Sequence, residues 1–386
     1  MKFALVGVGG AGGRLVEQFR RTEKETGRSF SKGSLLAFDT HKAAFEQYSE
    51  IPLDRHVLLG DLHSGIRGEG VGGDVDLAAD VARQDDDEIY REFDKLDVHN
   101  LDAVVVAAGL GGGTGGGAGP VIVDRLKTIT ENPVYGLGVL PDRSEPDQQA
   151  LNAARSLQSF VRISDGVVLF DNDSWHNSDK QGPLADWYGE LNRLHATRFL
   201  SVFALGELDS AEIAENTLDS SDIFRTLTTG GVASIGYAST ELDVNSGFFS
   251  RLLSKLRNGE KKYETEGRTV AMRTNDLIKR AATRQLTLPC SIASADRALI
   301  VLSGPPEECS RKGFESGRHW LEEETGAVEV FAGDEPRPDA SSVSAAILFS
   351  NVTEVPRIDE LQRRAVAAKS GTPQSHGQDQ RHNRQP

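Results

Sequence analysis

The sequence predicts an α/β fold: a doubly wound parallel sheet, then a long central helix and a second α+β domain with a mixed sheet. Apolar segments alternate with amphipathic helical segments up to about residue 170, as in parallel sheets. Glycine-rich turns follow two of the apolar segments. The chain has 386 residues, whereas single cores stop growing near about 250 residues, so we expect two domains.

The first domain, residues 1–183, contains the alternating pattern. We expect strands near 2–6, 35–39, 102–108, 134–140 and 166–171, and helices near 11–25, 74–96, 116–129 and 146–160. In such sheets ligands bind outside the carboxyl ends of the strands. The glycine turns fall at those ends.

The central helix is expected over 184–206, because residues 187–204 carry apolar side chains on more than one side. The second domain follows over 207–362. We expect its helices near 274–284 and 309–323 and its strands near 231–237, 297–302, 327–332 and 342–350. The polar segment 363–386 is too poor in apolar groups to order and is predicted to be disordered.

Composition excludes several classes of protein. The formal net charge of −15 argues against duplex nucleic acid as a partner and is compatible with a salt-rich cytoplasm. No apolar run reaches the roughly 18 residues of a membrane span, so we expect a cytoplasmic protein without direct membrane insertion. Cys290 and Cys309 lack metal-ligand spacing, and no protein-only metal site is visible.

The richest signal is the turn 109–119, in which eight of eleven residues are glycine. Such a turn costs backbone entropy, so it indicates a place where the backbone approaches something closely. Successive N–H groups and the start of the next helix favour an anion, and phosphate is the candidate. Thr114 supplies the only hydroxyl in this turn.

A second glycine turn, 7–13, also joins a strand to a helix. Gly7, Gly9 and Gly12 match the dinucleotide fingerprint, and Asp39 ends the next strand where that motif needs a ribose-binding acid. An NAD-dependent oxidoreductase is therefore an alternative. It does not predict the turn at 109–119, whereas one polyphosphate held from two sides explains both turns.

The segment Gly111–Gly117 (GGGTGGG) closely resembles the signature G-G-G-T-G-[TS]-G of the tubulin and FtsZ superfamily of polymerising GTPases. Residues 68–76 look like its third phosphate loop, 140–146 like its ribose-side loop, and 170–173 like the strand end whose Asn reads guanine. The segments 286–290 and 297–306 are most similar to the archaeal CetZ branch, associated with cell shape and motility.

The resemblance implies GTP or GDP as ligand, with Mg²⁺ held mainly by phosphates and water. Asn192 on the central helix is placed against the base. The implied nucleotide-binding residues are Gly9, Gly10, Ala11, Gly12, Gly13, Arg14, Asp39, Gly72, Gly73, Gly111, Gly112, Gly113, Thr114, Gly115, Gly116, Glu145, Asn172 and Asn192.

Hydrolysis requires a group that positions water, and Asp74 and Asp76 are the only acids beside the glycine turns. Asp219 and Asp222 are a better pair, although Asp219 or Ser220 is also a natural N-cap and Asp222 a natural first-turn acid for the helix that follows. The resemblance implies that their loop completes the active site of the next subunit in a head-to-tail homopolymer.

Two departures weaken the resemblance locally. Thr217 stands where FtsZ has Asn, and Pro146 stiffens the ribose-side loop, which leaves the role of Glu145 less certain. A second alternative is a filament regulator that binds nucleotide without hydrolysing it. The sequence does not decide between guanine and adenine, because Asn172 and Asn192 could hydrogen-bond either base.

Overall fold

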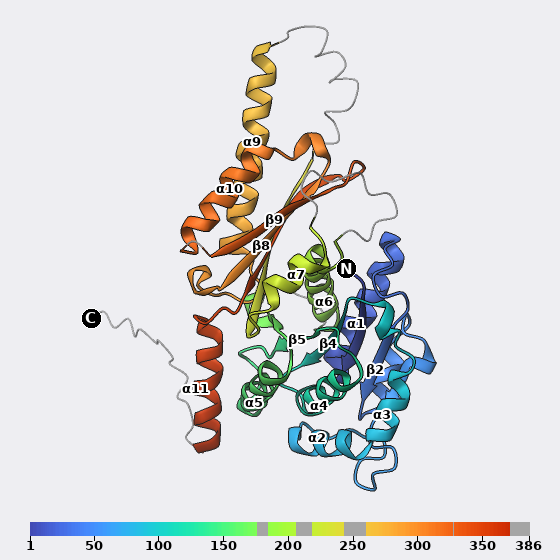
Figure 1. The fold of residues 1–386 in the computed structure, drawn as a ribbon. Helices are drawn as coiled ribbons and strands as arrows, with labels where there is room; N and C mark the ends of the chain where they lie inside the picture. The colour runs from blue at the N-terminus through green and yellow to red at the C-terminus, as the bar shows by residue number, and fades with distance from the viewer. Residues whose placement is uncertain (176–183, 206–217, 243–259, 327, 371–386) are drawn as a thin grey trace, which may run out of the picture.

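In the computed structural model, residues 1–175, 184–205, 218–242, 260–326 and 328–370 are described. Within them a sheet of ten strands runs through both halves of the molecule (Figure 1). The strand order is β3-β2-β1-β4-β5-β6-β7-β10-β8-β9. The strands are β1 (Phe3–Val8), β2 (Leu35–Asp39), β3 (His56–Leu58), β4 (Ala103–Gly109), β5 (Val134–Leu140), β6 (Val167–Asp171), β7 (Val232–Glu241), β8 (Arg297–Gly304), β9 (Glu329–Pro336) and β10 (Ser342–Ser350).

The strands from β3 to β7 are parallel, and β10 is antiparallel to both of its neighbours. The doubly wound parallel sheet and the mixed second sheet are therefore both confirmed. The two are joined by a short pairing of Val167 and Val168 with Val232 and Ala233.

Helices cover the two faces of the sheet. Alternate residues of β1 show this, because Phe3 packs with α1 and α6 whereas Ala4 belongs to the core under α2, α4 and α5. The helices are α1 (Gly9–Thr26), α2 (Val75–Gln84), α3 (Asp86–Phe93), α4 (Gly113–Ile129), α5 (Asp147–Ile163), α6 (Leu184–Phe203), α7 (Ser220–Leu227), α9 (Glu260–Arg284), α10 (Arg311–Glu324) and α11 (Pro356–Ser370).

The helix α6 connects the two edges of the parallel sheet. The amino group of Met1, just before β1, donates to the carbonyl of Leu205 at 2.8 Å, so α6 ends beside the amino edge. A helix of 20 residues is about 30 Å long, which carries its other end toward the carboxyl edge.

Two predicted helices were wrong in extent. The helix expected over 74–96 is two helices, because Asp85 leaves the helical conformation while its carboxylate accepts from the Gly60 N–H at 2.5 Å. The helix expected from 274 begins at Glu260.

The tail predicted to be disordered from residue 363 begins within a helix. Helix α11 runs to Ser370, past the predicted start of the disordered tail, because Arg357, Leu361 and Ala365 form a buried stripe on it and α11 packs against α5. The rest of that tail, 371–386, and Thr217 lie outside the described residues.

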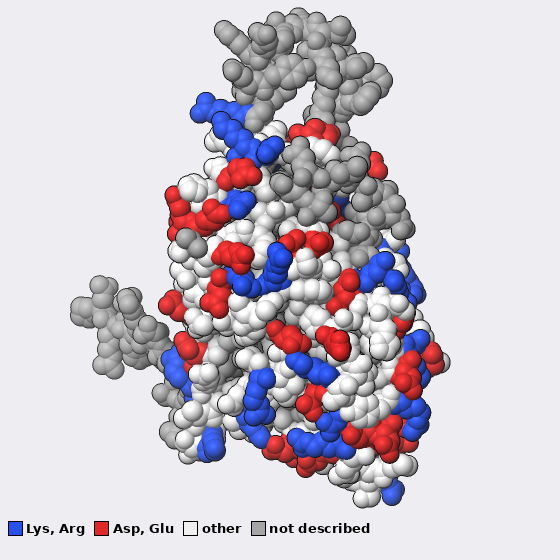
Figure 2. Space-filling model, viewed as in Figure 1, with Lys and Arg blue, Asp and Glu red and all other residues white. Residues whose placement is uncertain are grey.

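Charge is distributed in small groups on the visible surface. Acidic and basic side chains are interspersed on the face shown in Figure 2, which carries no continuous basic patch. In the described part of the chain, none of the helices is both apolar enough and long enough to span a bilayer.

Candidate functional site

The three glycine turns meet at the carboxyl edge of the parallel sheet. A Cβ atom on Gly9 would lie 2.8 Å from the backbone nitrogen of Gly115, and one on Gly113 would lie 2.8 Å from the carbonyl carbon of Gly73. Side chains at these positions would push the turns apart. The turn 111–117 therefore lies between the other two, in direct backbone contact with both.

The glycines serve two physical purposes. Some allow close packing: a Cβ on Gly12 would lie 2.1 Å from the Ala107 carbonyl oxygen, and one on Gly115 would lie 2.6 Å from that of Gly109. Others supply a left-handed backbone, with φ of +58° at Gly72 and +85° at Gly73, where no heavy atom of the described residues lies within 4 Å of the Cβ position.

The remaining residues of these turns lie in the same cluster. A Cβ on Gly13 would meet the Tyr48 ring and one on Gly116 the Ser156 hydroxyl, while Gly10 faces the Arg14 guanidinium. Ala11, Gly111 and Gly112 complete the cluster.

Two helices begin here without a cap. Helix α1 starts after Val8 and α4 after Gly112, and at both starts the structure records no side-chain cap hydrogen bond and no acidic residue in the first turn. The first N–H groups of a helix need acceptors. Two such starts side by side form a strong anion-binding position.

Asn152, which sequence reasoning missed, ties two of the turns together. Its amide nitrogen donates to the carbonyls of Gly73 at 2.9 Å and Gly111 at 3.1 Å, and the residue is 2% exposed. A buried polar residue on the inner face of a predicted helix was the available signal.

Thr114 contacts the end of β2. Its hydroxyl lies 2.7 Å from that of Thr40, a residue that sequence reasoning did not single out. The neighbouring Asp39 is 4% exposed, and its carboxylate accepts from the His41 N–H at 2.9 Å. Burial raises the pKa of Asp39, while that hydrogen bond and the charge of Arg14 act against the rise.

The ribose-side loop is held by α11. Arg364 donates to the Glu145 carbonyl at 2.8 Å, and Arg357 donates to the Pro141 carbonyl at 2.6 Å. Arg357 also pairs with Asp171 at 3.1 Å, both side chains being 2% exposed. The Glu145 carboxylate turns back to accept from the Asp142 N–H at 2.7 Å, and burial raises its pKa.

Asn172, directly after β6, bonds to a residue that the sequence analysis overlooked. Its Oδ1 lies 3.1 Å from Nε2 of His195, which is fully buried and stacked on Phe170. Asn192 is half-buried one turn earlier on α6. Tyr188, a further turn back, is exposed and lies within electrostatic range of Glu145 and Arg14.

The spacing of those α6 residues was the missed signal. Positions 188, 192 and 195 are separated by four and three residues, so they follow one face of a helix. That face extends from the exposed amino end of α6 down to the buried His195 beside Asn172.

Asp219 and Asp222 do not join this cluster. Asp219 caps α7, accepting from the N–H and hydroxyl of Ser221 at 2.7 and 2.5 Å, while Asp222 accepts from the Asp219 N–H at 3.2 Å. The Ser221 bonds lower the pKa of Asp219. The capping interpretation therefore describes both acids in this structure.

The position of α7 places these acids toward the other edge of the sheet. Helix α7 ends at Leu227, and β7 begins at Val232 beside Val167, the first residue of β6. Eight residues of helix span about 12 Å, so Asp222 lies near the amino edge, where the N-terminus is also found (Figure 1).

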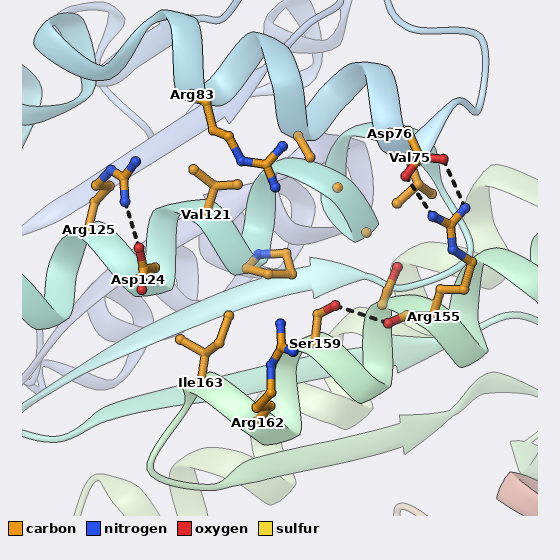
Figure 3. A pocket seen from close by; sticks show the side chains of 15 residues that line it. Val75, Asp76, Arg83, Val121, Asp124, Arg125, Arg155, Ser159, Arg162 and Ile163 are labelled. Atoms are coloured by element: carbon orange, nitrogen blue, oxygen red, sulfur yellow. Dashed lines mark hydrogen bonds and ion pairs between the residues drawn. The ribbon is translucent and has the colours of Figure 1, made fainter.

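The two acids beside the glycine turns are already engaged. Asp74 caps α2 by accepting from the Leu77 N–H at 2.9 Å, and Asp76 pairs with Arg155 at 2.6 Å. The latter pair borders a cavity of about 320 Å³ between α2, α4 and α5 (Figure 3). That cavity shares Gly116 and Gly117 with the glycine cluster but opens beside the helices. Asp74 and Asp76 thus serve a helix cap and a surface ion pair in this structure.

The chain matches known families over nearly its whole length. Residues 2–180 match the tubulin/FtsZ family GTPase domain, and residues 182–367 match the tubulin-like CetZ C-terminal domain. The tubulin-like proteins CetZ1 and CetZ3 of Haloferax volcanii are each 43% identical to it, the first over 96% of this chain and 93% of its own length, the second over 95% and 92%.

Solved structures agree with this assignment. CetZ1 from Haloferax volcanii, a GDP-bound monomer, has a TM-score of 0.81 and 40% identity, covering 96% of this chain and 100% of its own. CetZ2 from the same organism, a GTPγS-bound protofilament, has a TM-score of 0.80 and 31% identity, covering 96% and 99%. The sequence, the fold and these relatives together show that the chain belongs to the CetZ family within the tubulin/FtsZ superfamily.

Proposed function

We propose that this protein is a cytoskeletal GTPase that assembles head to tail and hydrolyses GTP after assembly. The convergence of three glycine turns on two uncapped helix starts carries the proposal. Related proteins described as GDP-bound and as a GTPγS-bound protofilament support it. By analogy with the archaeal CetZ proteins, we further propose a role in cell shape or motility.

The triphosphate would lie against the turns 9–13, 72–73 and 111–116. Backbone N–H groups at the starts of α1 and α4 would donate to its oxygens, and Thr114 would add a hydroxyl. In the described part of the chain, no group of three or more His, Cys, Asp or Glu side chains could hold a metal ion. Mg²⁺ held by phosphates and water fits this arrangement, and when bound it would offset the phosphate charge.

The nucleoside would lie between the ribose-side loop and α6. Glu145 and Asp39 are the acids on this side, and Asn172 and Asn192 are the amides that would read the base. Tyr188 offers an exposed ring for stacking at the amino end of α6. Asp39 is the last residue of β2, and both the GTPase and the oxidoreductase interpretations use it as a nucleotide-binding acid. Its position alone therefore favours neither function.

Asp219 and Asp222 would act on the nucleotide of an adjacent subunit. They lie toward the amino edge of the sheet, whereas the glycine turns lie at the carboxyl edge, so one subunit's acids can face another subunit's turns only when subunits stack in one direction. Asp222 holds its cap through one carboxylate oxygen, Oδ2, which leaves Oδ1 to orient water in line with the terminal phosphoryl group. Asp219 would fix the loop that presents it.

One assay tests the proposal. Light scattering and phosphate release are followed with GTP, with NADH and without nucleotide, in high salt with Mg²⁺, for the wild type and Asp222→Ala. We expect GTP-dependent scattering in the wild type. In the variant, phosphate release should fall by at least about 100-fold while polymers persist or last longer.

The control variant is Ser310→Ala, which removes the cap of α10, where Ser310 accepts from the Gly313 N–H at 3.3 Å. It should leave phosphate release unchanged. Adding Asp222→Ala protein to wild type should lower turnover more than dilution does, because each variant subunit disables its neighbour. Assembly without turnover in the wild type would favour the regulator, and NADH binding without GTP binding would favour the oxidoreductase.

A further inference from the structure

The buried pair formed by His195 and Asn172 has no place in the hydrolysis proposed above. His195 is 0% exposed, and its ring lies parallel to that of Phe170, with 4.2 Å between the ring centroids and an interplanar angle of 14°. Its Nε2 lies 3.1 Å from Oδ1 of Asn172. The histidine therefore cannot turn away from the amide without losing both contacts.

His195 is a neutral ring with a single N–H group. Burial, together with the charge of Arg198, lowers its pKa to about 3, so the imidazole ring is uncharged at neutral pH. Its Nδ1 is buried, and among the described residues it has no hydrogen-bond partner. A buried N–H without an acceptor costs more than a bare ring nitrogen, which places the proton on Nε2.

The position of that proton fixes the orientation of the Asn172 amide. The Nε2–H group of His195 can donate only to Oδ1, so the amide NH₂ group of Asn172 points away from the histidine. In the described structure this amide makes only the His195 bond. Because His195 is fully buried and Asn172 is half-buried, the open face of the amide is a donor face.

We propose that His195 determines base selectivity by holding Asn172 as a fixed hydrogen-bond donor toward a purine that carries an oxygen at C6. This inference rests on the proposed binding of GTP at the same site. Guanine presents the O6 acceptor to such a donor, whereas adenine presents its own 6-amino donor. An Asn172 amide that could rotate by 180° would offer a donor to guanine or an acceptor to adenine. Without His195 it would therefore not discriminate between the two bases.

The test compares the full-length wild type with His195→Phe, which keeps a flat ring against Phe170 and removes the N–H group. Affinities are measured in Mg²⁺ for GTP, inosine triphosphate, ATP and 2-aminopurine riboside triphosphate. Inosine has O6 but no 2-amino group, and 2-aminopurine has the reverse. We expect the ratio of GTP to ATP affinity to fall about 10-fold, through weaker GTP and inosine triphosphate binding, with 2-aminopurine binding unchanged.

An unchanged ratio in folded His195→Phe protein would overturn the inference. Nitrogen NMR of the wild type labelled at histidine gives a second measurement that does not depend on the variant. It should show the Nε2–H tautomer at His195, and an Nδ1–H tautomer would contradict the inference even if GTP binds. Failure of the wild type to bind any of the four nucleotides would instead overturn the proposed function, while the tautomer would still test the pair.

Discussion

Backbone packs against backbone in the three glycine turns, whereas long polar side chains hold the chain in place at the ends of β5 and β6. We call the first region, 9–13, 72–73 and 111–116, the glycine half of the site. The second, the side-chain half, comprises the loop 140–146, Asn172 and the residues that hold them. In the glycine half there is no space for a Cβ on Gly12. In the side-chain half the single side chain of Arg357 bonds both to Asp171, at the end of β6, and to the Pro141 carbonyl in the loop 140–146.

The difference predicts how each half responds to change. Backbone cannot rotate out of the way, so a methyl group added where two backbones touch, as at Gly12, must displace a whole strand or turn. A side chain in the other half can be removed without a clash, but the polar groups that it satisfied stay buried. The glycine half should therefore fail by steric strain, and the side-chain half by lost hydrogen bonds and unpaired charge.

The largest effect is expected for Gly12→Ala. The new Cβ would lie 2.1 Å from the Ala107 carbonyl oxygen, so α1 and β4 must separate. We expect a loss of more than about 5 kcal/mol in the free energy of unfolding, measured by urea denaturation. Gly10→Ala is the control for stability, because its Cβ would meet only the end of the flexible Arg14 side chain at 3.4 Å. Equal stability of the two variants would contradict this account of the glycine half.

Next in size is Arg357→Met, which breaks a buried pair in the side-chain half. Asp171 would lose the positive charge that it pairs with and keep only the Ser174 hydroxyl, and the Pro141 carbonyl would lose the Arg357 donor. We expect a loss of about 3 to 5 kcal/mol in the free energy of unfolding and weaker GTP binding through the loosened loop. The double variant Arg357→Met with Asp171→Asn should recover much of the stability, because it removes the unpaired charge.

Arg364→Ala is the matched control in the same helix. Its partner Asp147 is 49% exposed, so this ion pair contributes little. A loss of about 1 kcal/mol is expected, chiefly from the two loop carbonyls that Arg364 contacts. If both arginine variants lose the same stability, the buried pair does not organise the loop.

The two halves also differ in how well the sequence predicts them. A glycine turn between an apolar strand and a helix is recognisable from the local sequence, and the positions of Gly9 and Gly113 follow from two such turns at one sheet edge. The turn that contains Gly73 was expected from the family resemblance. Most strands of the parallel sheet were predicted for the same reason, since each of these apolar runs is continuous, whereas the three-residue strand β3 was not predicted.

The side-chain half depends on contacts between residues far apart in the chain. Arg357 reaches Asp171 across 186 positions, and nothing near either residue indicates the other. Helix α11 was missed because its segment is polar by composition. It is held in place by three buried residues, spaced four apart, and packs against α5 of the first domain. Asn152 and His195 were missed because a polar residue on an inner helix face is ambiguous until its partner is known.

An effect smaller than that of Arg357→Met is expected from pH, through His195. Its pKa is about 3 in the folded protein and near the ordinary value of 6.5 when unfolded, so the unfolded chain binds the extra proton between these values. Stability from the neutral ring is thus complete above about pH 6.5 and is lost as the pH falls. The wild type should lose about 1.4 kcal/mol more than His195→Phe between pH 7.5 and 5.5. Parallel unfolding profiles would show that His195 is not held neutral.

The smallest effect is expected for Gly189→Ala. It is the same substitution as Gly12→Ala, at a helical position that has space for the added methyl group. Gly189 lies in α6 between Tyr188 and Glu190, and outside its own helical backbone no heavy atom of the described residues lies within 4 Å of its Cβ position. An unfolded chain with alanine has less conformational entropy to lose on forming the helix than one with glycine. Thermal unfolding should therefore show that the free energy of unfolding rises by about 0.5 to 1 kcal/mol. A loss of stability would mean that the amino end of α6 is more crowded than the structure shows. A gain here beside a large loss at Gly12 would show that the cost in the glycine half comes from contact between backbones and not from replacing glycine as such.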